Sequence, residues 1–233
     1  MKKHLAILLL TALAVISVKA QSDPGTTTIY PRFGVNMSKF AGDKILTAAD
    51  GGSVKSKYKF GVVAGAEVEH QFTPLLAASA GLLYSMQGSR YDESYTNDPN
   101  GNYSLFKDMK YTMHFLTLPV LAVFNLGYNS AFSAKCGVQL GYLLNATSSN
   151  YYESGQIVDG ERLPNNPGDK FSGTVTDVFH RLEVSIPAGI SYKHDNLTVD
   201  LRYNIVITRN VYKYVDGVRN SNISLILGYG FTL

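Results

Sequence analysis

The sequence predicts an all-β protein, an eight-stranded antiparallel up-and-down transmembrane β-barrel with long external loops and short periplasmic turns. Eight segments alternate apolar residues with small or polar ones at a period of two, the pattern of a strand whose two faces meet different surroundings. The connections between these segments alternate between short and long, as they do in outer-membrane barrels. Beyond the N-terminal apolar run, no run of about 18 apolar residues is available to form a transmembrane helix.

The N-terminus has the features of a secretory signal peptide, which we assign to residues 1–20. A basic start precedes an apolar run from Leu5 to Val18, and small residues stand before the expected cleavage site. The run is shorter than the ~20 residues of a spanning helix, which argues against an uncleaved membrane anchor. We therefore expect cleavage after Ala20 and a single barrel domain over residues 21–233.

The composition limits the partners that the mature chain can have. The full sequence holds 21 Lys and Arg against 18 Asp and Glu, but three of the lysines lie in the predicted leader, so the mature chain is formally neutral. A neutral chain without a basic cluster has no positively charged surface for binding nucleic acid. The single cysteine, Cys136, cannot form an intramolecular disulfide.

The first four predicted strands each carry an apolar face made of alternate residues. Pro31 cannot donate a ladder hydrogen bond, so it should lie near a strand start or at a bulge. The fourth strand has the two most similar faces. In chain order, the apolar faces include Ile29, Phe33 and Val35 in residues 28–38, Phe60, Val62 and Val68 in residues 58–70, Leu76, Leu82 and Tyr84 in residues 76–87, and Leu116, Leu118 and Phe124 in residues 110–125.

The last four predicted strands repeat the pattern. A tight turn at residues 194–196 separates the sixth strand from the seventh. The eighth holds its alternation to the final residue, so it must pair with another strand, and the first strand is the partner that would close a barrel without an edge. The apolar faces include Val138, Leu140 and Tyr142 in residues 132–144, Leu182, Ile186 and Ile190 in residues 181–192, Leu197, Val199 and Leu201 in residues 197–208, and Leu225, Leu227 and Tyr229 in residues 221–233.

The faces opposite the apolar ones mix glycines with charged residues. Small side chains interleaved with long charged ones suit the narrow interior of an eight-stranded barrel. Aromatic residues stand toward both ends of the apolar faces, as in the girdles at membrane interfaces. We therefore expect the apolar faces to meet lipid, although alternation alone also allows a soluble lipocalin-like barrel. The charged residues expected inside are Arg32, Lys59, Glu67, Glu69, Lys135, Arg181, Glu183, Asp200 and Arg202.

Two interpretations of these interior charges are open. They could form a proton relay or an ion path through the barrel. Alternatively, they could form a mutually paired network that fills the lumen, because buried charges persist only when they are partnered. We favour the paired network, since an open pore is not expected at eight strands.

The predicted connections place the two kinds of loop at opposite ends of the barrel. Short connections and both termini share one end, and long connections rich in Gly, Asn, Asp and Ser share the other. Aromatic residues in the long connections, among them Tyr91, Tyr95, Tyr103, Phe106 and Tyr151, could form a binding surface or pack on one another over the barrel mouth. The short connections are residues 71–74, 127–130 and 193–196, and the long ones are residues 39–57, 88–109, 146–175 and 209–220.

The sequence assigns no catalytic, cofactor-binding or metal-ligating residue. His114 and His180 would suit an outer-membrane hydrolase only beside a nucleophile at the rim, but both fall on the lipid-facing parity. Residues 97–102 faintly resemble a calcium loop without its acidic closing residue, and their Asn, Asp, Pro and Gly predict a plain turn.

Several of the predicted strands contain short motifs, among them Phe33-Gly34-Val35-Asn36-Met37-Ser38 in the first strand and Gly228-Tyr229-Gly230-Phe231 in the last. These motifs resemble the PorT-like outer-membrane β-barrel proteins of the Bacteroidetes. The resemblance implies an eight-stranded outer-membrane barrel, and a few members of that family are linked to secretion or assembly of surface proteins. The aromatic C-terminal end, Tyr229 and Phe231, resembles the signal by which such barrels are recognised for insertion. The motifs are residues 33–38 (FGVNMS), 60–62 (FGV), 115–119 (FLTLP), 137–142 (GVQLGY), 201–204 (LRYN) and 228–231 (GYGF).

Our hypothesis from the sequence is a non-enzymatic integral outer-membrane barrel with a filled lumen, which acts through surface loops or envelope partners. The alternatives are an accessory factor for protein secretion or assembly across the outer membrane and a soluble periplasmic lipocalin-like binding protein. The expected partners are outer-membrane lipid, the barrel-assembly machinery during insertion, and envelope or secretion-system proteins. Neither nucleic acid nor a cofactor is expected.

Overall fold

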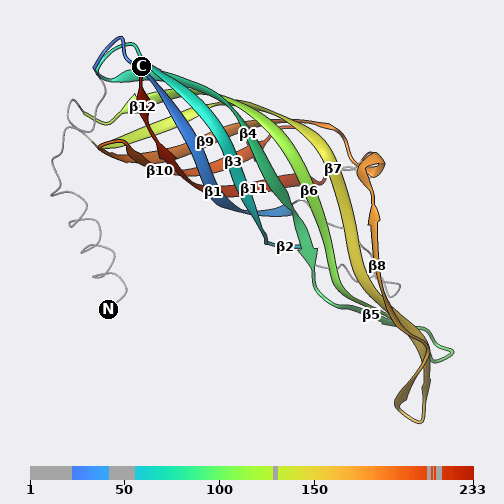
Figure 1. Cartoon of the computed structure of the whole chain (residues 1–233). Helices are drawn as coiled ribbons and strands as arrows, with labels where there is room; N and C mark the ends of the chain where they lie inside the picture. The colour runs from blue at the N-terminus through green and yellow to red at the C-terminus, as the bar shows by residue number, and fades with distance from the viewer. Residues whose placement is uncertain (1–22, 42–55, 128–130, 209–210, 212, 214–216) are drawn as a thin grey trace, which may run out of the picture.

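The computed structural model describes residues 23–41, 56–127, 131–208, 211, 213 and 217–233 (Figure 1). Within these residues, eight antiparallel strands close into a ring, which confirms the predicted fold class. The predicted signal peptide lies outside the described residues. In ring order, the strands are β1 (Thr27–Ala41), β3 (Lys59–Gln71), β4 (Leu76–Tyr91), β6 (Asn102–Asn125), β7 (Phe132–Val158), β9 (Leu182–His194), β10 (Leu197–Val206) and β11 (Arg219–Tyr229).

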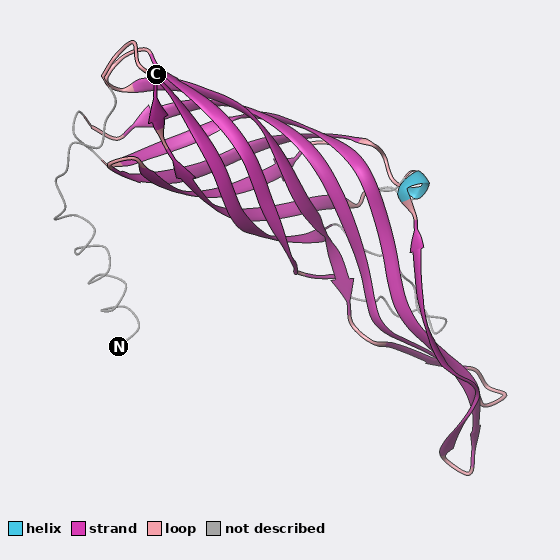
Figure 2. Ribbon diagram, in the orientation of Figure 1, coloured by secondary structure: helices cyan, strands magenta, loops and turns pink. Residues whose placement is uncertain are grey.

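Three short strands, the longer strand β8 and one helical turn complete the described secondary structure (Figure 2). β2 (Ser56–Lys57) pairs with β4, β5 (Ser94–Asn97) with β6, β8 (Glu161–Thr174) with β7, and β12 (Phe231–Thr232) with β1. The 3-10 turn η1 (Thr176–Val178) follows β8. Among the described residues, no helix has the length and apolar character needed to cross a membrane.

The period-two pattern sets the two faces of the ring as predicted. In β1, Arg32 and Asn36 are buried, whereas Phe33 is 62% and Val35 47% exposed. Directly paired residues of antiparallel strands share a face, and Phe33 lies opposite Leu227 of β11. The outer wall of the barrel is therefore apolar, and the inner wall of β1 is mainly polar.

The last strand closes the ring against the first, as the alternation predicts. β11 pairs antiparallel with β1 over ten residue pairs, from Arg32 with Gly228 to Ala41 with Arg219. β12 continues the same pairing with Ile29 opposite Phe231. A closed ring leaves no unpaired strand edge within the spanning wall, which is what hydrocarbon surroundings require.

Some inward glycines stand where the neighbouring strand crosses very close. A Cβ at Gly137 would lie 2.0 Å from the carbonyl oxygen of Val120, and a Cβ at Gly65 would lie 2.2 Å from that of Leu82. No side chain fits at such positions, so these glycines allow the wall to curve tightly. Gly141, on the same strand as Gly137, has room, because the nearest atom to its Cβ would be 3.5 Å away.

The described short turn between β9 and β10 has the predicted form. Asp195 adopts the left-handed conformation with φ of 51° and, with Asn196, forms a two-residue turn between the strands. Residues 72–75 connect β3 to β4. The middle of the third predicted turn, residues 128–130, lies outside the described residues.

Two of the predicted long loops are wrong as loops, because most of their residues are strands. β6 begins at Asn102 rather than near Lys110, and β7 runs on to Val158 rather than ending at Leu144. β5 and β8 pair with these extensions. The resulting sheet projects far beyond the ring, at the end opposite the C-terminus (Figure 1). We call it the arm, made of β5, residues 102–107, residues 151–158 and β8.

Backbone conformation at two tight turns explains how the arm forms. Asp159 and Gly160 both have positive φ, 52° and 82°, so they form the two-residue turn that matches the twist of a hairpin between β7 and β8. Gly101, with φ of 80°, completes the turn between β5 and β6. The other two predicted long loops, residues 39–57 and 209–220, lie partly outside the described residues, which leave out 42–55, 209–210, 212 and 214–216.

Candidate functional site

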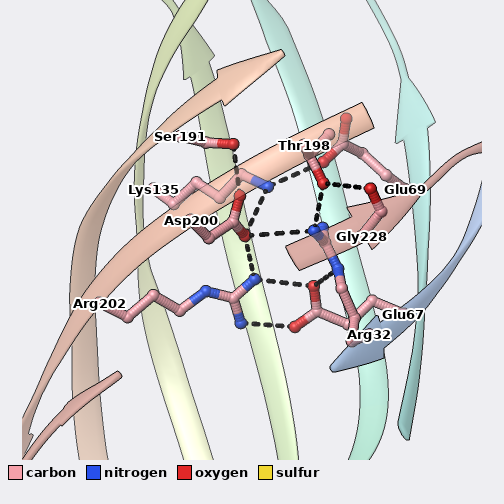
Figure 3. Close-up of polar contacts among 9 residues, drawn as sticks. All are labelled: Arg32, Glu67, Glu69, Lys135, Ser191, Thr198, Asp200, Arg202 and Gly228. Atoms are coloured by element: carbon pink, nitrogen blue, oxygen red, sulfur yellow. Dashed lines mark hydrogen bonds and ion pairs between the residues drawn. The ribbon is translucent and has the colours of Figure 1, made fainter. Parts of the chain in front are cut away.

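A network of six charged side chains lies inside the barrel (Figure 3). It is nearer the short turns, since Glu67 lies near the end of β3, and Lys135 and Asp200 lie near the starts of β7 and β10. Arg202 of β10 donates two parallel hydrogen bonds to the Glu67 carboxylate of β3, from Nη1 to Oε1 at 2.5 Å and from Nη2 to Oε2 at 2.8 Å. Its Nη2 also donates to Asp200 Oδ2 at 2.5 Å. The two-pronged geometry is the strongest form of guanidinium–carboxylate pairing. The pair joins β3 to β10, which are separated in the ring by β1 and β11.

Two further cations complete the network. Arg32 of β1 places Nε 2.9 Å from Glu67 Oε2 and donates from Nη1 to Thr198 Oγ1 at 2.6 Å. Lys135 of β7 places Nζ 3.3 Å from both Glu69 Oε2 and Asp200 Oδ2. Three cations thus face three carboxylates, and the formal charge of the network is zero.

The predicted paired network is confirmed for these six residues, and the remaining three interior predictions have different outcomes. Glu183 is buried but lies apart from the network, where it accepts a 3.3 Å hydrogen bond from Asn220. Lys59 is half-buried and donates to the carbonyl oxygen of Phe60. The inward orientation of Arg181 is wrong: it precedes β9, is exposed, and forms an ion pair with Asp177 at 3.4 Å. Alternation does not predict the orientation of Arg181, because β9 begins only at the next residue, Leu182.

The barrel interior is filled. A small apolar layer inside the barrel is formed by Val63, Leu83 and Ile226. The cavity beside this layer has a volume of about 10 Å³, which is at most the room that one water molecule needs. The soluble lipocalin-like alternative predicted a large apolar cavity instead of a charged lumen, and the buried ionic network contradicts it.

An apolar cluster closes the other end of the lumen. Phe179, just after η1, is fully buried, and its ring centroid lies 6.2 Å from that of Phe40 and 5.7 Å from that of Tyr111. Tyr91, one of the aromatic residues in the predicted long connections, belongs to this cluster. The prediction that these residues pack over the barrel mouth is therefore correct for Tyr91. The buried members are Phe40, Tyr91, Met113, Phe115, Leu143, Ala146, Phe179, Val211 and Val218.

The other loop aromatics pack on the arm. Tyr95 and Tyr103 stack with centroids 6.0 Å apart, and the Arg162 guanidinium lies 4.4 Å from the centroid of Tyr95. Glu153 accepts hydrogen bonds from Tyr103 at 3.0 Å and from Tyr151 at 3.1 Å. The bond to this carboxylate raises the pKa of Tyr151. The arm therefore has its own packed side chains.

A groove of about 830 Å³ lies between the arm and the barrel mouth. Its lining residues come from the ends of β2 and β4, from Asp92 and Glu93 in the connection between β4 and β5, and from the parts of β6, β7 and β8 at the base of the arm. Its charged lining residues are Lys57, Arg90, Asp92, Glu93, Lys107, Asp108, Lys110 and Lys170.

The two histidines considered for catalysis lie apart from the groove and the network. His114 points outward from β6, where its Nδ1 lies 2.6 Å from the Tyr84 hydroxyl at the lipid-facing wall. His180 is exposed after η1. Within the described residues, no group of three or more His, Cys, Asp or Glu side chains is arranged to hold a metal ion.

Residues 97–102 form a turn, as the composition predicts. The Asp98 carboxylate accepts hydrogen bonds from the backbone N–H of Asn100, from the backbone N–H of Asn102 and from the Asn102 side chain, at 2.9, 2.9 and 2.8 Å. These bonds, led by the one from the Asn102 side chain, hold the pKa of Asp98 below its ordinary value. Both carboxylate oxygens are engaged inside the turn.

The arm was not predicted, although the sequence contains one signal for it. Asp159-Gly160 is among the strongest local indications of a hairpin, yet it lies in a stretch whose Asn, Pro, Gly and Asp residues resemble a loop. The groove was not predicted either, because its lining comes from five strands and one connection and depends on the register of those strands.

Comparisons with known proteins agree with this architecture. The sequence model of the outer membrane protein beta-barrel domain matches residues 19–210. No curated protein is similar enough to match.

Similar solved structures include three bacterial proteins. The attachment invasion locus protein Ail of Yersinia pestis is 16% identical, with 89% of this chain and 99% of that chain covered and a TM-score of 0.36. Neisserial surface protein A is 15% identical, with 87% and 97% covered and a TM-score of 0.39. The outer membrane protein OprG of Pseudomonas aeruginosa is 12% identical, with 93% and 99% covered and a TM-score of 0.37.

The family match spans most of the strands of the ring. The closed ring, its apolar outer wall and its filled polar interior are the features expected of such a domain. The chain therefore belongs to the outer membrane protein beta-barrel domain family.

Proposed function

We propose that this protein is a non-enzymatic outer-membrane barrel that acts by presenting its arm to a protein partner outside the membrane. The observation that carries the proposal is the extent of β6 and β7, which run for 24 and 27 residues. A spanning strand needs only about 9–11 residues. More than half of each strand is therefore available beyond the bilayer, and the filled lumen supports a scaffold rather than a pore.

The arm offers two strand edges for contact. Among the described strands, β5 pairs only with β6, and β8 pairs only with β7. β8 also exposes Leu163 and Phe171, which are 52% and 51% accessible. An unpaired edge with exposed apolar side chains is the kind of surface that adds a strand from another chain.

Site-specific photo-crosslinking in intact cells tests this proposal. A crosslinker at Leu163 should give a discrete adduct, whereas one at Phe72, exposed in a turn at the opposite end, should not give the same adduct. Replacing residues 92–108 and 151–171 by tight turns should leave a folded barrel. This shortened protein should no longer restore the phenotype of a strain that lacks the gene, whereas the full-length protein should. A shortened barrel that complements fully would refute the role of the arm.

The resemblance to PorT-like proteins supports a second candidate, an accessory role in secretion or assembly of surface proteins. Motifs such as residues 33–38 and 137–142 carry it. Deletion of the gene should then remove specific proteins from the secreted or surface fraction. An unchanged surface proteome would exclude this role and leave the first proposal standing.

We also propose the export route expected from the sequence. Residues 1–20 would direct secretion, and N-terminal sequencing of the membrane-inserted protein should begin at Gln21. The aromatic pair Tyr229 and Phe231, exposed with centroids 5.1 Å apart, would be recognised by the barrel-assembly machinery. Changing both residues to Ala should reduce insertion, measured as heat-modifiable protein in the membrane fraction.

A further inference from the structure

A row of cationic side chains crosses three neighbouring strands at the base of the arm. Lys57 of β2 lies directly opposite Arg90 of β4, and Arg90 lies directly opposite Lys110 of β6. Residues directly opposite in antiparallel strands have Cβ atoms about 5 Å apart, and like charges in that arrangement are destabilising. The row therefore favours an anion that neutralises it.

Acidic side chains of the described residues neutralise only part of the positive charge that lines the groove. Lys57 pairs with Asp92, and Lys107 lies 3.9 Å from Glu93. Within the described part of the chain, Arg90, Lys110 and Lys170 form no ion pair. All three are exposed and line the groove. Asp108 also lines the groove, but it belongs to neither of these two ion pairs.

The strand register extends the row with hydroxyl donors and further cations. Lys110 lies opposite Ser149 of β7, and Ser149 lies opposite Ser172 of β8. Tyr151, two residues from Ser149 and hence on the same face, lies between Lys107 and Lys170. The groove thus combines cations with hydroxyl groups, which together suit a phosphate group.

We take His114, which ends the uncharged lipid-facing stretch of β6, as the edge of the hydrocarbon, and this reference places the groove at the level of lipid headgroups. Lys110, Thr112, His114 and Leu116 alternate along one face of β6, and Leu116 is exposed on the lipid-facing wall. Lys110 is four residues from His114, about 13 Å along the strand and about 10 Å along the membrane normal at a tilt of 35–45°. Headgroups occupy roughly 5–8 Å beyond the hydrocarbon, a distance that the long side chains of the row can reach.

We propose that this groove binds the phosphate-bearing headgroup of an anionic lipid in the outer leaflet. The Arg90 guanidinium would hold two phosphate oxygens, Lys110 and Lys170 would supply point charges, and Ser149 and Ser172 would donate hydrogen bonds. The volume of about 830 Å³ accommodates a headgroup larger than phosphate alone. This inference goes beyond the proposed function, because it concerns a lipid ligand and is independent of the protein partner of the arm.

The test measures binding of short-chain lipids to the full-length protein in a neutral detergent. Dihexanoyl phosphatidylglycerol should bind at least about tenfold more tightly than dihexanoyl phosphatidylcholine. The triple variant Arg90→Gln, Lys110→Gln, Lys170→Gln should lose about 100-fold in affinity for phosphatidylglycerol, since each of the three cations near an anionic headgroup contributes roughly fivefold.

A charge-matched variant separates a defined site from diffuse electrostatics. Arg181→Gln, Lys213→Gln, Arg219→Gln removes the same charge from exposed residues outside the groove and should bind as the unchanged protein does. An equal loss in both variants, or equal affinity for the two lipids, would overturn the proposal. Competition by inorganic phosphate at the same concentration as phosphatidylglycerol would also overturn it, because the ligand would then be free phosphate. Heat-modifiable migration on gels should confirm that both variants are folded.

Discussion

Arg202 and Glu67 are separated by 135 residues in the chain, yet they form a bidentate pair inside the barrel with hydrogen bonds of 2.5 and 2.8 Å. Both side chains are almost completely buried, and Glu67 also holds Arg32. A buried pair of this kind depends on both partners, because the loss of one leaves an uncompensated charge away from water.

Glu67→Ala should therefore destabilise the barrel by about 3–5 kcal/mol, since two guanidinium groups lose their shared carboxylate. The measurement is the urea midpoint of the protein refolded in lipid vesicles. Glu69→Ala is the control on the same strand: Glu69 is partly exposed and pairs only with Lys135 in the network, so its loss should cost clearly less. Equal costs would contradict the central position of Glu67.

Two glycines of β7 should respond differently to alanine. At Gly137 the new Cβ would lie 2.0 Å from Val120 O, whereas at Gly141 the nearest atom would be 3.5 Å away. Gly137→Ala should cost about 1–3 kcal/mol or prevent closure of the ring, as overpacking does, and Gly141→Ala should be close to neutral. Folding yield and unfolding midpoint distinguish the two, and a tolerant Gly137 would show that the wall can relax.

Phe179 should be important for stability although it lies outside the ring strands. Phe179→Ala removes a fully buried ring from the cluster that closes the mouth and should cost about 3–5 kcal/mol. The adjacent Val178 is exposed, so Val178→Ala should change the free energy of unfolding by no more than about 0.5 kcal/mol. The same unfolding assay applies. Similar values for the two variants would argue against a packed cap.

The turn at Asp98 should loosen in acid. The pKa of Asp98 is lowered in the folded turn, so its stabilising effect is present above the unfolded pKa of about 3.9 and disappears as the pH falls through the lower folded value. Hydrogen exchange at the Asn100 and Asn102 amides, which donate to Asp98, should accelerate relative to the intrinsic rate in that range. In Asp98→Asn this acid-dependent change should be absent. Its persistence would assign the effect to another group.

Cys136 should report lipid contact. It is exposed on the outer face of β7, opposite Ala122 of β6 and Ala188 of β9. A spin label on this native cysteine should collide more often with dissolved oxygen than with a water-soluble nickel chelate in vesicles. Leu163→Cys in a Cys136→Ala background places the label on the arm and should show the reverse preference. Water-like accessibility at Cys136 would contradict a lipid-facing wall.

Much of the ring could be predicted from local patterns, and the arm could not. Phe33 and Arg32 are assigned to opposite faces by alternation alone, and the structure agrees. Tyr103 and Leu105 also alternate with their neighbours, but they lie in a polar stretch that resembles a loop. The burial of both depends on pairing with β5 and β7, and that of Tyr103 also on stacking by Tyr95 and Arg162, which no local pattern contains.

The same distinction applies to the charges. The sequence shows that Arg32, Glu67, Asp200 and Arg202 share the inward parity, but the specific pairs depend on strand register around the ring. Arg181 has the same parity and lies outside, because β9 begins one residue later. The cationic row of the groove likewise exists only because Lys57, Arg90 and Lys110 fall at one register position on three strands.

The sequence by itself determined the number of ring strands, the two faces of each strand and the pairing of the last strand with the first. These follow from side-chain periodicity and from the requirement that no strand edge remain unpaired in lipid. Only the tertiary structure decided which interior charges pair, how the mouth is closed and how far β6 and β7 extend. Those features depend on register, curvature and packing between residues far apart in the chain, and periodicity along a single strand carries no information about them.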